Sequence, residues 1–222
     1  MALSSSIRVV VLEDFPIILE GLVSWLNQQP GVDVVGQAVD HPAARQQLAA
    51  HAPAILLMDL MVGGRDGVDF IREIRAAYPA VAVLVFSVHD EMVYAERVLK
   101  AGAHGYVMKR EPAADLLKAL HAVAAGELAV SRQVTLLLLK RAVRPTTTAA
   151  SAAGGVSVLT DRELHVFQLI GTGLSPRRIS EELKLSIKTV ETHRENIKNK
   201  LGLHSSVEVI RAATLWLGPQ GA

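Results

Sequence analysis

The chain has 222 residues, half of them hydrophobic, so it is long enough to bury the core of one large domain or of two small ones. It contains no cysteine, which excludes a disulfide scaffold, a thiolate zinc finger and a thiol nucleophile. The formal net charge is +1, so the overall charge indicates neither a nucleic-acid coat nor a membrane-surface protein.

The N-terminal residues do not have the layout of a signal peptide. Arg8 interrupts the first apolar run, and Glu13 and Asp14 follow that run directly. The apolar runs 80–85 and 136–139 are much shorter than the roughly 18 residues that a membrane helix needs. Together with the absence of cysteine, these features predict a cytoplasmic protein without a membrane partner.

Five short apolar runs, rich in β-branched residues, recur along the first 125 residues, and each is followed by a stretch of helical length. The runs are Ile7–Leu12, Val32–Val39, Ala54–Met58, Val81–Phe86 and Gly105–Val107. Because they are apolar throughout, they are typical of strands covered on both faces. Any single run could be a buried helix segment, but the fivefold recurrence favours a doubly wound parallel sheet.

A helix is expected over residues 112–125, and the apolar stretch Val134–Val143 fits one more helix. Residues 145–155 are small, polar and interrupted by proline and glycine. Such a segment cannot bury enough apolar surface to offset the entropy of ordering it, which predicts a flexible linker.

The charge changes sign across this linker. Residues 1–130 carry a net charge of −5 and residues 156–222 carry +2. We therefore predict three parts. They are a first domain at residues 1–128, a linker with an extra helix at 129–155 and a second domain at 156–222.

The second domain has marked helix starts. Thr160-Asp-Arg-Glu163 is a capping box, Ser175 precedes a proline at the first helical position, and Ser186 can cap the helix that carries Lys188. A last helix is expected from about Ser205 to Leu217. Four helices in some sixty residues, two of them joined by a short turn, predict a helix-turn-helix module.

Polar side chains end several of the predicted strands of the first domain. Glu13 and Asp14 follow the first strand, Asp59 the third and Ser87 the fourth, and Lys109 follows the fifth. Because the carboxyl ends of parallel strands meet at one edge, we expect these side chains to converge. Three crowded carboxylates repel one another and offer the hard oxygen ligands that Mg²⁺ prefers.

With a metal neutralising the cluster, one carboxylate can act as a nucleophile towards a phosphoryl group. Asp59 ends the central strand and is the expected nucleophile, while Lys109 and Ser87 are placed to bind the phosphoryl oxygens. Each residue alone also has a structural explanation, as a helix cap, a strand-end hydroxyl or a surface ion-pair partner. Their conjunction favours the site.

Four stretches resemble the receiver domain of bacterial two-component response regulators. They are Val10–Pro16, Leu57–Asp59, Val85–Asp90 and Gly102–Lys109. The resemblance implies a flavodoxin-like (βα)5 fold, bound Mg²⁺ and a partner sensor histidine kinase. It also implies the roles of single residues: Asp59 as phosphoacceptor, Glu13 and Asp14 as metal ligands together with Asp59, Ser87 as switch hydroxyl, Tyr106 as switch aromatic and Lys109 as phosphate sensor.

The loop after Asp59 departs from the family pattern. The family usually has Met-Pro three and four residues after the acceptor, where this chain has Val62 and Gly63. Glycine gives this loop more freedom than proline would. Met61, two residues after Asp59, could hinder the attacking water and lengthen the life of the acyl phosphate.

The second domain resembles the LuxR-type DNA-binding domain. The matching stretches are Leu159–Glu163, Gly173–Ser175, Arg178–Leu183 and Leu185–Gly202. Together with the receiver resemblance, they make the chain similar to the NarL/FixJ class of response regulators. The resemblance implies binding to double-stranded promoter DNA as a homodimer, with the last helix as dimer surface and RNA polymerase as a further candidate partner.

The helix that follows Ser186 has two distinct faces. At 100° per residue, His193, Arg194, Ile197 and Leu201 fall on the side of Val190, which predicts the inward face. The predicted DNA-contacting residues of this domain are Arg177, Arg178, Lys188, Thr189, Glu191, Thr192, Glu195, Asn199 and Lys200.

Two of those residues also have another explanation. Glu191 could accept from a cytosine amino group. Alternatively, Glu191 and Glu195 form a solvated face or pair with Arg194 and Lys198.

The sequence therefore predicts a DNA-binding transcriptional regulator controlled by phosphorylation of Asp59, and not an enzyme beyond catalysis of its own dephosphorylation. A phosphatase with an aspartyl intermediate would need a second acid where Met61 stands. The remaining alternative is a DNA-binding protein whose receiver is a non-phosphorylated interaction module.

Overall fold

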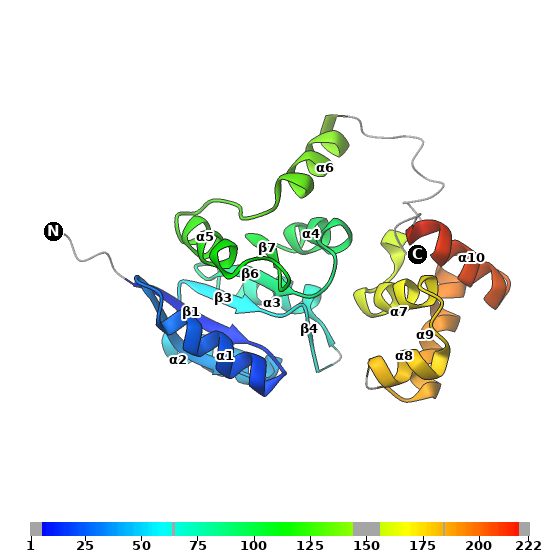
Figure 1. The fold of residues 1–222 in the computed structure, drawn as a ribbon, viewed down its shortest axis with the longest axis horizontal. Helices are drawn as coiled ribbons and strands as arrows, with labels where there is room; N and C mark the ends of the chain where they lie inside the picture. The colour runs from blue at the N-terminus through cyan, green and yellow to red at the C-terminus, as the bar shows by residue number, and fades with distance from the viewer. Residues whose placement is uncertain (1–5, 64, 144–155, 184, 218–222) are drawn as a thin grey trace. The chain divides into compact units, whose positions relative to one another are not determined.

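The structure is a computed structural model that describes residues 6–63, 65–143, 156–183 and 185–217. The chain divides into two compact units, residues 1–144 and 145–222. Figure 1 shows that the first is an α/β unit and the second an all-α unit. The predicted linker at residues 145–155 lies outside the described residues.

The first unit contains a five-stranded parallel sheet with the strand order β2-β1-β3-β6-β7. The strands are β1 (Ile7–Leu12), β2 (Val32–Ala38), β3 (Ile55–Met58), β6 (Ala82–Ser87) and β7 (Gly105–Met108). The helices are α1 (Pro16–Asn27), α2 (His41–His51), α3 (Gly67–Ala77), α4 (Glu91–Lys100), α5 (Ala113–Ala124) and α6 (Arg132–Val143). The predicted doubly wound, flavodoxin-like fold is confirmed.

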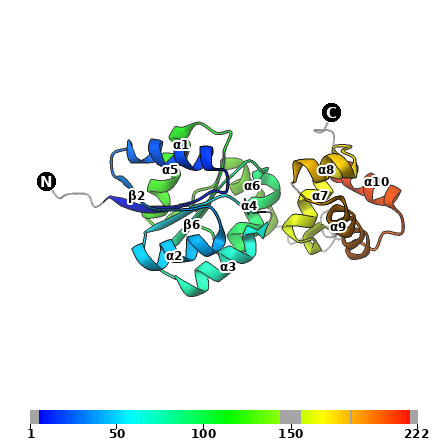
Figure 2. The ribbon, with the colours of Figure 1, turned by 90° about the horizontal axis from the view of Figure 1, so that it is seen from below.

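Both faces of the sheet are covered. Figure 2 shows α1 and α5 on one face and α2 and α3 on the other. Val9 and Val11 of β1 belong to the apolar cluster that includes α1 and α5, and the alternate residues Val10 and Leu12 are also buried. Burial on both faces explains why the strands are apolar throughout.

The register of the strands brings their carboxyl ends to one level. Leu12 pairs with Met58, and Met58 pairs with Val85. The residues that follow these strands therefore lie side by side at one edge of the sheet.

A small antiparallel hairpin that the sequence pattern did not predict follows β3. Its strands β4 (Met61–Val62) and β5 (Arg65–Asp66) lie on either side of a turn that contains Gly63, whose φ is +57°. Val62 is buried. The freedom expected for this loop is thus limited at Met61 and Val62, because both residues pair across the hairpin.

The segment after α5 closes the edge of the sheet. Ala129 forms a parallel bridge with Gly105. Its N–H donates to the carbonyl of His104 at 2.9 Å, and its carbonyl accepts from the N–H of Tyr106 at 2.8 Å. An edge strand otherwise presents unpaired backbone groups, so this bridge protects β7.

Helix α6 belongs to the first unit and packs against α4. Val134 of α6 is buried, and the hydroxyl of Ser131, just before α6, donates to Glu91 Oε1 of α4 at 2.6 Å. The helix expected at Val134–Val143 is therefore present, and it begins at Arg132.

The second unit consists of a short 3₁₀ helix η2 (Val156–Val158) and the helices α7 (Asp161–Gly171), α8 (Pro176–Glu182), α9 (Ile187–Lys200) and α10 (Ser206–Leu217). The expected caps are confirmed: Thr160 and Glu163 form the capping box, Ser175 caps α8 and Ser186 caps α9. Helix α10 packs on α7 through Phe167 and Trp216, whose ring centroids lie 5.8 Å apart.

Candidate functional site

The carboxyl ends of β1 and β3 bring three carboxylates together. Oxygen atoms of Glu13, Asp14 and Asp59 all lie within 4.8 Å of one another. Glu13 and Asp59 are buried, with 1% and 7% of their surface exposed, and Asp14 is half-buried. Such crowding of negative charge is unfavourable unless a cation compensates for it.

Lys109, which follows β7, supplies part of this compensation. Its Nζ atom donates to Glu13 Oε2 at 2.5 Å and to Asp59 Oδ2 at 2.6 Å. Burial alone would lower the pKa of Lys109, but its interactions with Asp59 and Glu13 outweigh burial and raise this pKa. Burial raises the pKa of Glu13, because the hydrogen bond and charge of Lys109 offset only part of the desolvation.

Two carboxylate oxygens of the cluster have no hydrogen-bond partner among the described residues. They are the buried atoms Asp14 Oδ1 and Asp59 Oδ1. The other oxygen of Asp14 accepts from the N–H of Gly63 at 3.0 Å, and the other oxygen of Asp59 accepts from Lys109. Unsatisfied hard oxygen ligands of this kind fit a divalent cation such as Mg²⁺.

The hairpin after Asp59 is held close to the cluster. The hydrogen bond from Gly63 to Asp14 fixes the turn on the metal-ligand side. A Cβ atom at Gly67 would lie 2.2 Å from the carbonyl oxygen of Leu60, so the start of α3 requires glycine at this point. Met61 is only partly buried.

Ser87 and Tyr106 lie beside the cluster. Ser87 is the last residue of β6, and Tyr106 lies within β7. Both are buried. The Tyr106 hydroxyl donates to the carbonyl of His89 at 2.9 Å, and Ser87 Oγ accepts from the N–H of His89 at 3.4 Å. Burial raises the pKa of the Tyr106 phenol, and its hydrogen bond with Ser87 offsets only part of this effect. Tyr106 is thus packed inward in this structure.

In the second unit, α9 has the two faces that its sequence predicts. Val190 and Ile197 are buried, and His193 and Arg194 are partly buried. The exposed residues of the opposite face are Lys188, Glu191, Thr192, Glu195 and Asn199.

Both glutamates of the exposed face are paired along the helix. Arg194 lies 3.2 Å from Glu191, and Lys198 lies 2.7 Å from Glu195. These are the partners that the alternative interpretation of the sequence named. Thr189 and Thr192 make local hydrogen bonds, to Ser186 Oγ and to the carbonyl of Lys188.

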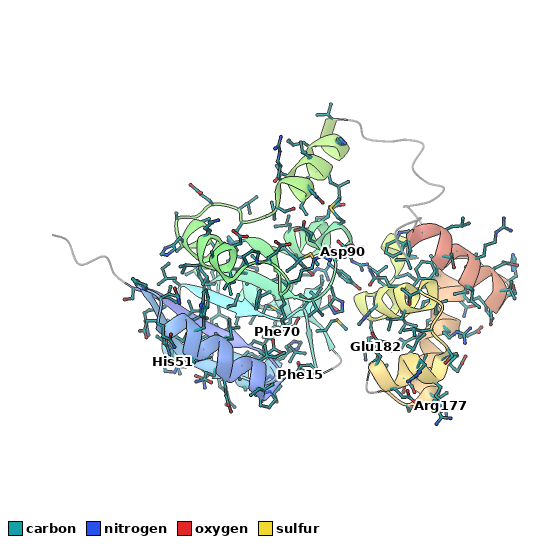
Figure 3. All side chains as sticks on the ribbon, in the orientation of Figure 1. Phe15, His51, Phe70, Asp90, Arg177 and Glu182 are labelled. Carbon is teal, nitrogen blue, oxygen red and sulfur yellow. The ribbon has the colours of Figure 1, made fainter. Side chains whose placement is uncertain are left out.

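The basic residues expected at the DNA backbone differ in their surroundings. Arg177 and Arg178 of α8 both pair weakly with Glu181, at 3.4 and 3.3 Å. Arg177 projects away from the helices (Figure 3). Lys200, in contrast, lies 2.7 Å from the buried carboxylate of Glu163.

Several contacts near these sites join residues that are far apart in the chain, and no sequence pattern indicates them. Arg162 donates to the carbonyl of Leu183 at 3.0 Å, across 21 residues of chain. Ser131 reaches Glu91 across 40 residues. The signal for Glu163 was its capping box, which did not indicate Lys200.

Comparison with known protein families matches both units. The family described as "Response regulator receiver domain" matches residues 9–121, and "Bacterial regulatory proteins, luxR family" matches residues 157–213. Within the described residues, no helix is long and apolar enough to cross a membrane.

Individual relatives match almost the whole chain. The oxygen regulatory protein NreC of Staphylococcus epidermidis is 32% identical over 209 residues, which are 93% of this chain and 96% of that protein. RcsB from Salmonella enterica serovar Typhimurium, solved on the promoter P1flhDC with the phosphomimetic BeF3−, is 26% identical with a TM-score of 0.56, covering 94% and 98% of the two chains. A structure of two RcsB dimers bound to two parallel DNAs is 26% identical with a TM-score of 0.57, covering 95% and 98%.

Proposed function

Because this chain belongs to the response regulators that join a receiver domain to a luxR-family DNA-binding domain, we propose that it regulates transcription through phosphorylation of Asp59. The observation that carries the choice of residue is the position of Asp59. It ends the central strand, binds Lys109 through one oxygen and keeps the other oxygen without a partner among the described residues.

The phosphoryl donor in this proposal is a sensor histidine kinase. An Asp59 oxygen attacks the phosphorus of the kinase phosphohistidine, and the imidazole leaves. Lys109 is within reach of Asp59 and is placed to pair with the new phosphoryl oxygens, and the Ser87 hydroxyl donates to one of them.

Glu13, Asp14 and Asp59 would hold Mg²⁺ in this site, with Asp14 Oδ1 and Asp59 Oδ1 as available ligands. A bound Mg²⁺ neutralises the carboxylates and the incoming phosphoryl group. Glu13 is the most buried of the three and also accepts a hydrogen bond from Lys109, so it would hold the metal ion next to the Lys109 ammonium group.

The chain is not an enzyme in the ordinary sense, because its family consists of transcription regulators. The one reaction we assign to it besides phosphoryl uptake is hydrolysis of its own acyl phosphate. Met61 lies two residues after Asp59 and is apolar, so we expect it to exclude the attacking water. Met61→Asn should therefore shorten the life of the phosphorylated protein, and an unchanged dephosphorylation rate would remove Met61 from this role.

Phosphorylation adds close to two negative charges at Asp59. We propose that Lys109 and Ser87 move towards the phosphoryl group and that Tyr106 and α4 adjust with them. Two contacts support transmission to α6, namely the backbone hydrogen bond from Tyr106 to Ala129 and the hydrogen bond from Ser131 to Glu91.

We assign residues 1–128 to the receiver, 129–155 to the connecting segment, whose helix α6 packs on the receiver, and 156–222 to the DNA-binding domain. Promoter DNA is contacted by the exposed face of α9 and by the basic residues of α8. The residues assigned to it are Arg177, Arg178, Lys188, Thr189, Glu191, Thr192, Glu195 and Asn199. We propose that dimerisation through α10 compensates for the modest charge of one domain, and the structure of two RcsB dimers bound to DNA supports binding as a dimer. The proposed location is the cytoplasm, with RNA polymerase as a further partner.

DNA affinity with and without phosphorylation tests this function. Duplexes that bind the protein treated with acetyl phosphate and Mg²⁺ are first selected from a random pool. The affinities of wild type and Asp59→Asn for one selected duplex are then measured with and without this treatment. Tighter binding after treatment of the wild type alone supports the proposal. Equal binding by both proteins, treated or not, would favour a receiver that acts as a non-phosphorylated interaction module.

A further inference from the structure

Two adjacent residues at the start of α7 hold the two sides of the helix-turn-helix. Arg162 Nη2 donates to the carbonyl of Leu183, where α8 ends and the turn into α9 begins. Glu163 Oε2 accepts from Lys200 Nζ at 2.7 Å, and Lys200 is the last residue of α9. We propose that Arg162, Glu163 and Lys200 form a clamp that positions α9 for base recognition, and that Lys200 is a positioning residue and not a phosphate contact.

The clamp is anchored on two buried residues of α7, whereas the side chain of Lys200 is 38% exposed. Arg162 and Glu163 are 8% and 3% exposed, in a helix whose apolar side packs on α9 and α10. The carboxylate of Glu163 is itself fixed by the capping box, because it also accepts from the N–H of Thr160 at 2.8 Å. Lys200 therefore binds an acceptor whose position is already determined.

A helix of 14 residues is about 21 Å long, so a small tilt at one end displaces side chains at the other. Leu183 fixes the turn before α9, and Lys200 fixes its end. An ion pair that buries one of its charges contributes little net stability, since desolvation offsets the attraction, but it can select one geometry. We therefore expect the clamp to fix the position and tilt of α9 relative to α7 and α8, with little effect on the stability of the domain.

A phosphate contact by Lys200 conflicts with this arrangement. An ammonium group that turned to DNA would leave the carboxylate of Glu163 buried without its cation, which is unfavourable. Lys198 offers a comparison on the same helix, because its ammonium group pairs with the exposed Glu195 of α9 itself, 2.7 Å away. His193 lies close enough to interact with both Arg162 and Glu163; burial and the charge of Arg162 lower its pKa, and the charge of Glu163 opposes this shift.

The test uses the full-length protein, treated with acetyl phosphate and Mg²⁺. The probes are a duplex enriched by the wild type from a random pool and a scrambled duplex of the same composition. Affinity for each is measured over a range of salt concentrations. We expect Lys200→Met to weaken binding to the enriched duplex by about tenfold, comparable to the loss of one base contact. Binding to the scrambled duplex and the salt dependence should not change.

Two variants separate positioning from charge. Glu163→Gln keeps the cation of Lys200 but weakens the clamp, so it should reduce binding to the enriched duplex alone, as Lys200→Met does. Lys200→Arg should restore most of the selectivity. Lys198→Met is the matched control, and we expect it to leave the ratio of the two affinities within about twofold of wild type.

Three results would overturn the clamp. If Lys200 contacts a phosphate, Lys200→Met should weaken binding to both duplexes and reduce the slope of log affinity against log salt concentration by about 0.9. Glu163→Gln should then bind as tightly as wild type. A role in stability alone requires both affinities to fall in proportion to the folded fraction measured by circular dichroism. Unchanged selectivity in both variants would also reject it. The inference depends on DNA binding through α9, so a wild type that enriches no duplex refutes that function and the clamp's role in it together.

Discussion

Lys109 Nζ lies 2.6 Å from Asp59 Oδ2, so the expected phosphoacceptor carries its own cation before any phosphoryl group arrives. The same ammonium group lies 2.5 Å from Glu13 Oε2, and none of the three side chains is more than 11% exposed. The resting site is therefore a partly compensated cluster, in which Lys109 neutralises one of three carboxylates.

Replacing Lys109 with methionine should destabilise the first unit. The substitution keeps the apolar stem but leaves two buried carboxylates without a cation, which should cost about 3 kcal/mol. Added Mg²⁺ should restore part of this loss by taking over the compensation. Urea denaturation with and without Mg²⁺ measures both effects. A variant as stable as wild type in the absence of Mg²⁺ would show that the carboxylates do not depend on Lys109.

Mg²⁺ itself should stabilise the wild type, because two buried carboxylate oxygens of the cluster have no hydrogen-bond partner in the described part of the chain. At about 100 times its dissociation constant the ion should add about 2.7 kcal/mol to the free energy of unfolding. Asp14→Asn should abolish most of this increment. Asp33→Asn, on an exposed position of β2, is the control and should respond to Mg²⁺ as wild type does. Equal responses of both variants would place the ion elsewhere.

Gly105 allows the segment after α5 to approach β7. A Cβ atom there would lie 2.5 Å from the carbonyl oxygen of Ala129 and 2.8 Å from Leu84. Gly105→Ala should therefore lower stability by about 1 to 3 kcal/mol and should speed hydrogen exchange at the amides of Tyr106 and Ala129. Gly21→Ala is the control, because nothing lies within 4 Å of its added methyl group. If both amides of Gly105→Ala exchange at the wild-type rate, the backbone bridge does not depend on the absence of a side chain at residue 105.

His193 should make the DNA-binding unit less stable in mild acid. Burial and the charge of Arg162 lower its pKa below the ordinary value of 6.5. The unfolded chain therefore binds the proton more readily, so stability is full above about pH 6.5 and falls as the pH decreases towards the folded pKa. His193→Gln should flatten this dependence below about pH 6.5, and His204→Gln, on an exposed residue, should not. Urea denaturation across that range distinguishes them, and parallel curves for wild type and His193→Gln would reject the assignment.

The parts of the molecule that follow a repeating pattern could be predicted from the sequence. Strands buried on both faces are apolar throughout, so β1 and β3 and the carboxylates after them followed directly from the runs. The capping residues Thr160, Ser175 and Ser186 marked the helix starts for a similar local reason.

The remaining contacts depend on tertiary structure. The hairpin of Met61–Val62 consists of two-residue strands, which are too short for any periodicity. The bridge of Ala129 to Gly105 is a single backbone contact, and its side chains carry no sign of it. Lys200 was predicted on charge alone to meet phosphate, but the fold places Glu163 next to it. Long-range pairing of this kind has no signal in one sequence.

The intact mass of the protein after incubation with acetyl phosphate and Mg²⁺ shows directly whether Asp59 is the phosphoacceptor. We expect one added phosphoryl group on the wild type, none on Asp59→Asn and one on the control Asp33→Asn. Unmodified wild type, or an adduct that persists in Asp59→Asn, would contradict the assignment of Asp59 as the phosphoacceptor.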